Sequence, residues 1–416
     1  MKADVIVLGA GIVGVSTALH LQMQGRSVVL VDRKVPGEGT SYGNAGLIER
    51  SSVIPYAFPR NLAALAKYAL NRSSDVRYDP LYLPRIAPFL FSYWRNSSPK
   101  KLAVAARAML PLVEASVSEH DALVEAAGAA HLIREKGWIA AYKTPARFET
   151  AVAQAKALAS YRLSYDVLSP KDFAALEPSF RTGEGGIAGA VHWRDPKTVT
   201  DPGELTKQYA RLFESRGGVV ATGDAATLAP AADGWTVTAS TGQLSAREAV
   251  VALGPQSGLV FRRFGYRIPL AVKRGYHRHY RLEAGHSLGH SVVDEEAGYV
   301  LAPMSRGVRL TTGIEFADPK APAMTVQISR DERIARALLP LGEAVEETPW
   351  LGLRPCLPDM RPVIGAAPRH PGLWFNFGHA HHGLTLGPVT GRLLAAMMTG
   401  GELPTDPEPY APSRFG

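Results

Sequence analysis

Continuous apolar runs and helical periodicity alternate in the first part of the chain. Residues 5–8 are an uninterrupted apolar run of strand length, which is typical of a parallel strand buried on both faces, and residues 27–31 are predicted to form a second buried strand. Residues 12–24 between them are predicted to form a helix that ends at Gly25. The order strand, helix, strand predicts a parallel sheet of the doubly wound α/β class.

Further along, the periodicity changes several times. Residues 60–135 have mostly helical character, and residues 219–254 hold further strands, the last of which we expect to rejoin the first sheet. Polar and apolar positions alternate from 268 to 316, as in an antiparallel sheet. A strand at 373–377, a glycine-punctuated turn and a helix at 390–398 then repeat the opening pattern. The predicted fold class is therefore α/β, with an α+β second lobe built on an antiparallel sheet and inserted into the first lobe.

The turn between the first strand and helix carries the pattern G-x-G-x-x-G, formed by Gly9, Gly11 and Gly14. In a dinucleotide-binding unit the first glycine permits the tight turn, the second lets a pyrophosphate approach the backbone, and the third lets the helix pack closely. The second strand is followed by Asp32, whose carboxylate can accept hydrogen bonds from a ribose and disfavours the 2′-phosphate of NADP. This segment predicts a site for NAD or FAD.

A glycine-rich loop, GEGTSYGNAG, follows the second strand. Its backbone N–H groups and the hydroxyls of Thr40 and Ser41 are suited to lie along a phosphate or an isoalloxazine ring. The same composition is also typical of an ordinary surface loop, and the residues alone leave both interpretations open.

Three histidines stand in the stretch FGHAHHGLTLGP near the end of the sequence. They resemble metal ligands, but adjacent histidines in an extended loop point apart, and no nearby cysteine adds a ligand. The glycines of the stretch, Gly378, Gly383 and Gly387, indicate instead a backbone loop that approaches a flat group closely. A helix N-terminus behind this loop would stabilise negative charge on that group. We therefore expect no metal here.

Composition narrows the class of protein. The 416 residues are many for a single core, and 46% hydrophobic with 20% charged residues is typical of a globular enzyme. The apolar N-terminal segment carries Asp4 early and lacks a cleavage site of small residues, so we do not expect export. The single cysteine, Cys356, excludes an internal disulfide and fits a reducing compartment. The net charge of +8 suits an anionic membrane surface or an acidic substrate, and without a Lys/Arg run we expect no nucleic-acid partner.

Four segments together resemble the FAD-dependent amino-acid oxidoreductases of the D-amino acid oxidase superfamily, and most of all its bacterial D-amino acid dehydrogenase branch. The segments are VIVLGAGIVGVSTALHL with VDR, TSYGNAGLI, GLRPCLPDMRPVIG and LWFNFGHAHHGLTLGPVTGRLLAAMMTG. They occur in order along the whole chain, and the last two are distinctive of the superfamily. The resemblance implies a Rossmann-like FAD-binding lobe of glutathione-reductase type, interleaved with an antiparallel-sheet substrate lobe.

The resemblance also implies chemistry and site residues. Members oxidise an amine carbon by hydride transfer to flavin N5, giving an imine that water hydrolyses to a 2-oxo acid. Arg354 in the G-x-R-P turn would bind the substrate carboxylate as a bidentate pair, the alternative being a structural ion pair. His381 would lie in the loop that faces the substrate amine. Tyr276, or else Tyr299, would be the substrate tyrosine.

The residues expected to bind FAD come from both ends of the chain. They are Gly9, Gly11, Ile12, Val13, Gly14, Asp32, Arg33, Thr40, Ser41, Asn44, Gly46, Leu47, Gly254, Gly378, His382, Gly383, Leu384 and Thr385. We expect FAD to be non-covalent, because Cys356 does not stand at the spacing found in the covalent flavoproteins of the superfamily.

Both expected lobes are discontinuous. The FAD-binding lobe would comprise residues 1–58, 182–258 and 345–416, and the substrate lobe residues 59–181 and 259–344. The substrate would be a D-amino acid, with sarcosine or glycine, D-hydroxyproline or an opine as alternatives. An NAD-dependent dehydrogenase and a flavoprotein subunit of a larger complex are the other interpretations. The electron acceptor would be oxygen or a quinone of the respiratory chain. We expect a cytoplasmic location, with peripheral contact to the inner face of the plasma membrane and homo- or hetero-oligomerisation left open.

Overall fold

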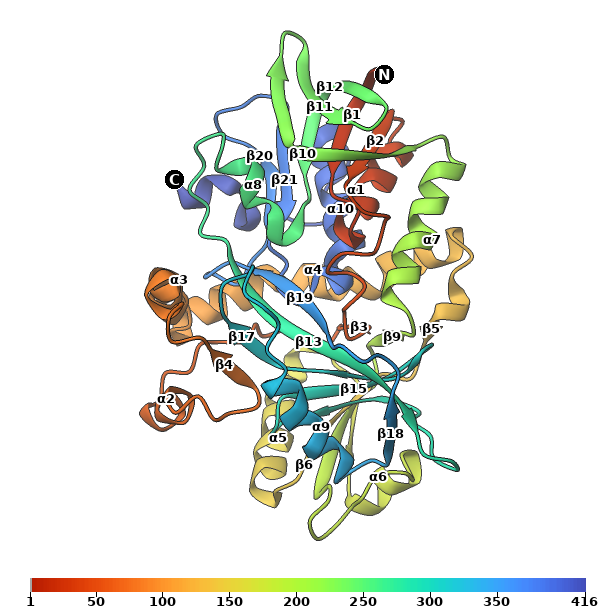
Figure 1. Cartoon of the computed structure of the whole chain (residues 1–416), viewed down its shortest axis with the longest axis vertical. Helices are drawn as coiled ribbons and strands as arrows, with labels where there is room; N and C mark the ends of the chain where they lie inside the picture. Colours follow the sequence, from red (N-terminus) through yellow and green to blue (C-terminus); the bar gives the residue numbers. More distant parts are fainter. Residues whose placement is uncertain (1) are drawn as a thin grey trace.

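The computed structural model describes residues 2–416, except for the side chain of Ala64. Within this range the strands form two large sheets, the first in the upper half and the second in the lower half of Figure 1. The first sheet has the order β1-β2-β10-β11-β12-β21-β20. Its strands are β1 (Lys2–Leu8), β2 (Val28–Asp32), β10 (Val219–Ala231), β11 (Gly234–Ala239), β12 (Gly242–Val251), β20 (Val363–Ala366) and β21 (Leu373–Phe377).

The second sheet follows the order β4-β17-β13-β16-β15-β14-β6-β8-β7, with β18 and β19 also paired to β13. Its strands are β4 (Val76–Tyr78), β6 (Trp138–Tyr142), β7 (Tyr165–Leu168), β8 (Gly189–Trp193), β13 (Ala271–Leu282), β14 (Ser291–Asp294), β15 (Tyr299–Met304), β16 (Gly307–Thr311), β17 (Ile314–Phe316), β18 (Leu341–Ala344) and β19 (Trp350–Cys356). A small third sheet consists of β3 (Leu47–Ile48), β5 (Ile133–Arg134) and β9 (Lys197–Val199). Most pairs of the second sheet are antiparallel, as the alternating pattern predicted.

Parallel pairing forms the centre of the first sheet. β10, β2, β1, β12 and β21 are parallel neighbours in this order. Val5 and Val7 face one hydrophobic core, and Ile6 and Leu8 face a second core on the other side, so the apolar run of β1 is buried on both faces. The prediction that the strand before Gly254 rejoins this sheet is confirmed, because β12 lies beside β1.

Helices cover the first sheet unequally. The helices are α1 (Ile12–Met23), α2 (Leu62–Ala69), α3 (Leu83–Asn96), α4 (Pro99–Ala126), α5 (Pro145–Ala157), α6 (Pro170–Leu176), α7 (Pro202–Ser215), α8 (Gly258–Phe261), α9 (Val326–Arg336) and α10 (Gly383–Thr399). Side chains of α1, α4, α7 and α10 share one core with the sheet, whereas α8 and the β11 strand cover the other face. Figure 1 shows α4 crossing the middle of the molecule below α10.

Two glycines let α10 lie against α1. A Cβ atom on Gly391 would stand 2.8 Å from the backbone nitrogen of Thr17, and one on Gly387 would stand 3.1 Å from the side chain of Ile12. Gly387 therefore serves helix packing and not the approach of a loop to a flat group, which corrects the sequence interpretation. The predicted start of this helix at residue 390 was also wrong. Gly383, Gly387 and Pro388, which the sequence analysis assigned to a turn, lie inside α10.

Strand pairing departs from the expected lobe boundaries. β8 falls in the range 182–258 and β19 in the range 345–416, yet both belong to the second sheet. α4 falls in the range 59–181, yet it packs into the core of the first sheet. The chain crosses between the two sheets more often than the hydrophobic periodicity of the sequence indicates. The reason is that strands pair with partners far away in the sequence, which periodicity does not reveal. The division into two lobes stays our proposal. Among the described residues, no helix is long and apolar enough to cross a membrane.

Candidate active site

A cavity of about 1030 Å³ takes its walls from both large sheets and from the loops between them. The predicted residues that line it are Gly9, Gly11, Ile12, Val13, Asp32, Arg33, Thr40, Ser41, Asn44, Leu47, Gly254, Tyr276, Arg354, His381, His382, Gly383 and Leu384. The glycine motif, the loop after β2 and the C-terminal loop therefore meet at one cavity, of the size expected for a large ligand.

The glycine turn after β1 leaves no room for side chains at two of its positions. Gly9 has φ +107°, and a Cβ there would stand 2.5 Å from the carbonyl oxygen of Ala252. A Cβ on Gly14 would stand 1.8 Å from the oxygen of Gly9, so Gly14 serves close helix packing and does not line the cavity. The Asp32 carboxylate accepts hydrogen bonds from the backbone nitrogens of Ala10 (2.7 Å) and Lys34 (3.0 Å). The carboxylate thus holds the turn in place at the cavity wall.

The loop at residues 37–46 is part of the site and not a free surface loop. The Ser41 hydroxyl accepts a hydrogen bond from the backbone nitrogen of Ile12 (2.9 Å) and so caps α1, whose own N-cap residue is a glycine. Asn44 donates from its side-chain amide to the carbonyl oxygen of His381 (3.3 Å). Thr40 donates to a backbone oxygen of β19 (3.0 Å). The loop therefore connects the N-terminal and C-terminal parts of the cavity wall.

Three further residues assigned to cofactor binding lie behind the wall. A Cβ on Gly46 would stand 2.3 Å from a backbone oxygen of β9, and one on Gly378 would stand 2.5 Å from the side chain of Leu357. Thr385 donates from its hydroxyl to the carbonyl oxygen of Leu47 (3.1 Å). None of the three lines the cavity. They bring neighbouring segments together, which corrects their predicted direct role.

The first turn of α10 points at the cavity and is fixed by a buried histidine. Gly383 and Leu384 line the cavity, and the positive end of the helix dipole favours negative charge there. Pro388 lacks the N–H that would bond to the Leu384 carbonyl, and the His120 ring lies 2.7 Å from that oxygen through Nε2. Burial lowers the pKa of His120 to about 4, so the ring is neutral and Nε2 carries the proton that it donates.

Arg354 reaches the cavity from β19 without a protein counter-ion. Its guanidinium donates to the carbonyl oxygens of Gly313 (2.7 Å) and Thr312 (3.0 Å). No carboxylate among the described residues forms an ion pair with it, which removes the alternative of a structural ion pair. A Cβ on Gly275 would stand 2.5 Å from Nη1, so only glycine there leaves space for the guanidinium. Burial lowers the pKa of Arg354 from its ordinary value, as expected for a cation without a partner.

Neither predicted substrate tyrosine has a free hydroxyl at the cavity. Tyr276 contributes to the wall, but its hydroxyl donates to Glu315 (2.6 Å) and accepts hydrogen bonds from Arg274 (2.9 Å) and from the backbone of Met324 (3.0 Å). Tyr299 is buried in the core of the second sheet and does not line the cavity. The structure therefore gives neither hydroxyl to the substrate: that of Tyr276 is bound within the second sheet, and the Tyr299 ring is part of the core of that sheet.

Residues that the sequence interpretation missed complete the same wall. Glu49, Tyr56, Lys273 and Glu295 all line the cavity. The Tyr56 ring centroid lies 5.2 Å from that of His381. Glu49 and Tyr56 closely follow the TSYGNAGLI segment, and that proximity is a signal that could have found them. Glu295 stands in a turn with no motif and could not have been found in that way.

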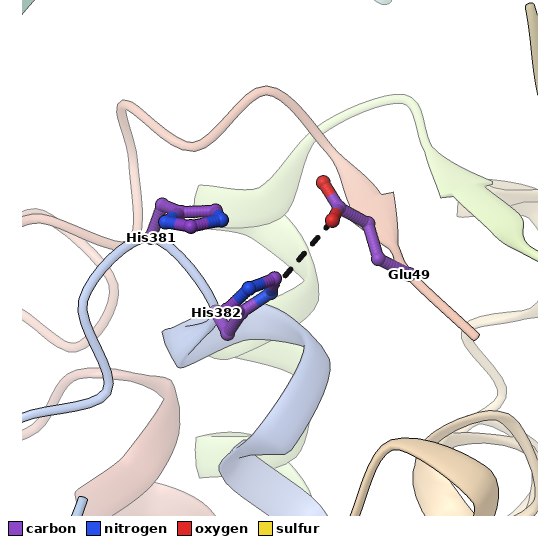
Figure 2. A group of neighbouring side chains, drawn as sticks. All are labelled: Glu49, His381 and His382. Carbon is purple, nitrogen blue, oxygen red and sulfur yellow. Dashed lines mark ion pairs between the residues drawn. The ribbon is translucent and has the colours of Figure 1, made fainter. Parts of the chain in front are cut away.

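Figure 2 shows Glu49, His381 and His382 pointing toward one another. His382 Nδ1 lies 3.7 Å from a Glu49 oxygen, and the three groups are close enough to hold a metal ion. Burial lowers the pKa of both histidines, and for His381 the neighbouring charges of Arg354 and Lys273 contribute. These two cations also repel a metal ion, so we keep the prediction that the histidines are a neutral wall of the pocket.

The fold and the cavity have counterparts among known proteins. Residues 4–397 match the model of the family described as FAD dependent oxidoreductase. The chain belongs to this family. FAD is thus the cofactor, and the NAD-dependent interpretation is wrong. The glycine turn after β1, the N-termini of α1 and α10 and the size of the cavity fit FAD.

Similar relatives and structures cover nearly the whole chain. A D-amino acid dehydrogenase of Chromohalobacter salexigens is 28% identical, with 99% of each chain covered, and one of Sinorhizobium medicae is 30% identical, with 99% of this chain and 100% of the relative covered. Glycine oxidase from Geobacillus kaustophilus has a TM-score of 0.75 at 20% identity, with 99% of each chain covered. Iminodiacetate oxidase from Chelativorans sp. BNC1 has a TM-score of 0.72 at 20% identity, covering 98% of this chain and 99% of that one. The expected oxidoreductase class and two-sheet fold are confirmed.

A chelator tests the interpretation of the histidines. We expect dialysis of the holoenzyme against EDTA to leave turnover and FAD content unchanged, because no step of the site requires a metal ion. The measurement is turnover with an artificial electron acceptor, together with metal analysis of the untreated protein. Loss of activity that zinc or another divalent ion restores would instead make Glu49, His381 and His382 a metal site.

Proposed function

We propose that the protein oxidises the amine-bearing carbon of an amino acid, with D-amino acids as the first candidates. FAD, when bound, supplies the acceptor for the hydride that leaves this carbon. The imine formed is hydrolysed by water to a 2-oxo acid, and oxygen or a quinone takes the electrons. The relatives named D-amino acid dehydrogenase support this assignment.

The observation that carries the proposal is the position of Arg354. Within the described residues, this guanidinium lines a large cavity and bonds to two backbone carbonyl groups and to no carboxylate, so it is available to a carboxylate of the substrate. A planar fork of N–H donors holds a carboxylate at two points, which fixes the neighbouring carbon in one orientation. Among the described residues, the His381 carbonyl accepts one hydrogen bond, from Asn44 at 3.3 Å, and its second lone pair can accept from the substrate ammonium.

Non-covalent binding of FAD is part of the proposal. Cys356 lines the cavity and is the only cysteine of the chain, so it is the one thiol that could form a bond to a flavin. Burial raises the pKa of the Cys356 thiol. A protonated thiol is a poor nucleophile, which supports the absence of a covalent link.

We also propose that the protein works at the cytoplasmic face of an anionic membrane. The segment 60–101 holds eight Lys and Arg residues and two Asp residues, most of the net positive charge of the chain. Leu62, Leu81 and Phe91 on and beside α2 and α3 are exposed by 84%, 88% and 60%. Exposed apolar side chains among basic residues favour an interfacial position on anionic lipids. Oligomerisation stays open.

Anaerobic titration tests the catalytic proposal. Holoenzyme mixed without oxygen with D-amino acids, cyclic imino acids and N-alkyl glycines should lose its visible flavin absorbance with at least one of them, because hydride transfer reduces the ring. Admission of air then distinguishes an oxidase, which regains its colour within seconds, from a dehydrogenase, which does so slowly. A spectrum that none of these compounds changes would reject the proposal.

Substitution of Arg354 tests the carboxylate site. Arg354→Lys should raise the KM of the preferred substrate by about 10- to 100-fold, since one charged bidentate pair is lost. FAD content should stay unchanged. Arg361→Lys is the matched control, because Arg361 pairs with Asp359 and lies outside the cavity. An unaltered KM for Arg354→Lys contradicts the assignment, and loss of FAD would point to a structural role.

Vesicle sedimentation tests the membrane proposal. The holoenzyme should sediment with phosphatidylglycerol vesicles and not with phosphatidylcholine vesicles, and added salt should release it because screening weakens the attraction. The double substitution Leu62→Ser with Leu81→Ser should reduce sedimentation, whereas Leu259→Ser, at a leucine exposed elsewhere, should not. Equal binding to both lipids, or none, would contradict the proposal.

A further inference from the structure

The wall of the cavity that Arg354 lines holds charges of both signs. Arg354 of β19 and Lys273 of β13 are register partners and both line the cavity. Glu49, next to β3, and Glu295, in the turn between β14 and β15, line it as well. A ligand with a single charge could pair with the two cations or with the two carboxylates, but not with both.

Three consecutive acidic residues stand at the end of β14 and in the turn that follows it, and the fold uses two of them. Asp294 accepts hydrogen bonds from the ammonium of Lys143 (2.7 Å) and from the backbone nitrogen of Glu296 (3.0 Å). Glu296 accepts one from the backbone nitrogen of Lys143 (2.7 Å). No side chain in the described part of the chain forms an ion pair or hydrogen bond with the Glu295 carboxylate, which is open to the cavity.

The surroundings of Glu295 make an unpaired negative charge unfavourable. Its position inside the cavity, followed by the charges of Asp294 and Glu49, raises the pKa of Glu295 to about 7. Tyr56 lines the same cavity, and the charges of Glu295 and Glu49 raise the pKa of its phenol. Two carboxylates next to an aromatic ring are a favourable place for a cation.

Two lysines of the protein already have other contacts. Lys143 is bound to Asp294, and Lys273 Nζ lies 4.3 Å from the centroid of the Tyr93 ring. A cation that pairs with Glu295 would therefore come from a ligand. A dicarboxylic substrate would instead bring a second negative charge to Glu295 and be repelled.

We propose that an ammonium or guanidinium group in the substrate side chain binds against Glu295, with Glu49 and Tyr56 beside it, while Arg354 binds the α-carboxylate. The substrate class is then an amino acid with a basic side chain. This inference rests on the proposed function, because it takes the carboxylate site at Arg354 as its starting point.

Neutral isosteres isolate the effect of the side-chain charge. D-citrulline has the shape of D-arginine without its charge, and D-norleucine replaces D-lysine in the same way. With an artificial electron acceptor, kcat/KM of the holoenzyme should be about 10- to 100-fold higher for the charged member of each pair, the factor expected for a charged hydrogen-bonded pair. D-glutamate should be the poorest substrate.

A substitution in the turn locates the effect. Glu295→Gln should lower kcat/KM for D-arginine to near that for D-citrulline, with FAD content unchanged. Glu296→Gln is the matched control, because it removes a charge from the same turn and keeps the acceptor oxygen that bonds to backbone nitrogens. This control should leave the preference for D-arginine intact.

The outcomes separate this inference from the proposed function. Reduction of the flavin by neutral D-amino acids as fast as by basic ones, or a preference for D-glutamate, would overturn the inference and leave the proposed function standing. A preference for D-arginine that survives Glu295→Gln would also overturn it. If Glu295→Gln does not fold, Glu295→Asp, which keeps the charge on a shorter side chain, should retain part of the preference for D-arginine. The comparison of D-arginine with D-citrulline in the wild-type protein decides between charged and neutral substrates without any variant. Absence of flavin reduction by every amino acid would reject both.

Discussion

The close contact between α1 and α10 is the constraint on which the cavity depends. Helices normally pack with their axes 8–10 Å apart because side chains separate them. Gly387 and Gly391 remove the side chains of α10 where it meets α1, and a Cβ at Gly391 would collide with the α1 backbone. As a result, two helices from opposite ends of the chain begin at the same cavity, at Ile12 and Gly383. Both N-termini carry partial positive charge, which suits the anionic parts of FAD.

The features that the sequence predicted correctly depend on local patterns. The apolar runs of β1 and β2, the glycine turn and Asp32 are close in sequence, and each requires little more than its neighbours to adopt its structure. The start of α10 was predicted wrongly for the opposite reason. Pro388 is tolerated inside the helix because the carbonyl that it leaves unpaired bonds to His120 of α4, a contact that no local pattern contains.

The substrate end of the cavity shows why the remaining residues were missed. In β13, Gly275 lies beside Arg354, so the next residue, Tyr276, projects its hydroxyl to the other side of the strand. The register that decides this is set by pairing with β19 far along the chain. Glu295 reaches the cavity only because β14 pairs with β6 and β15. Such non-local pairings determine which of many acidic residues meet at the site.

The histidine-rich loop contributes shape and no charge. Burial is the main cause that lowers the pKa of His379, to about 3, and that lowers the pKa of His381 and His382. A histidine whose pKa lies below its ordinary value is neutral near physiological pH, so these rings do not add to the positive charge of Arg354 and Lys273. Charged rings would compete with the guanidinium for a carboxylate and would pair with Glu49. Neutral ones leave the carboxylate of a substrate to Arg354, with Lys273 as its register partner in the same cavity wall.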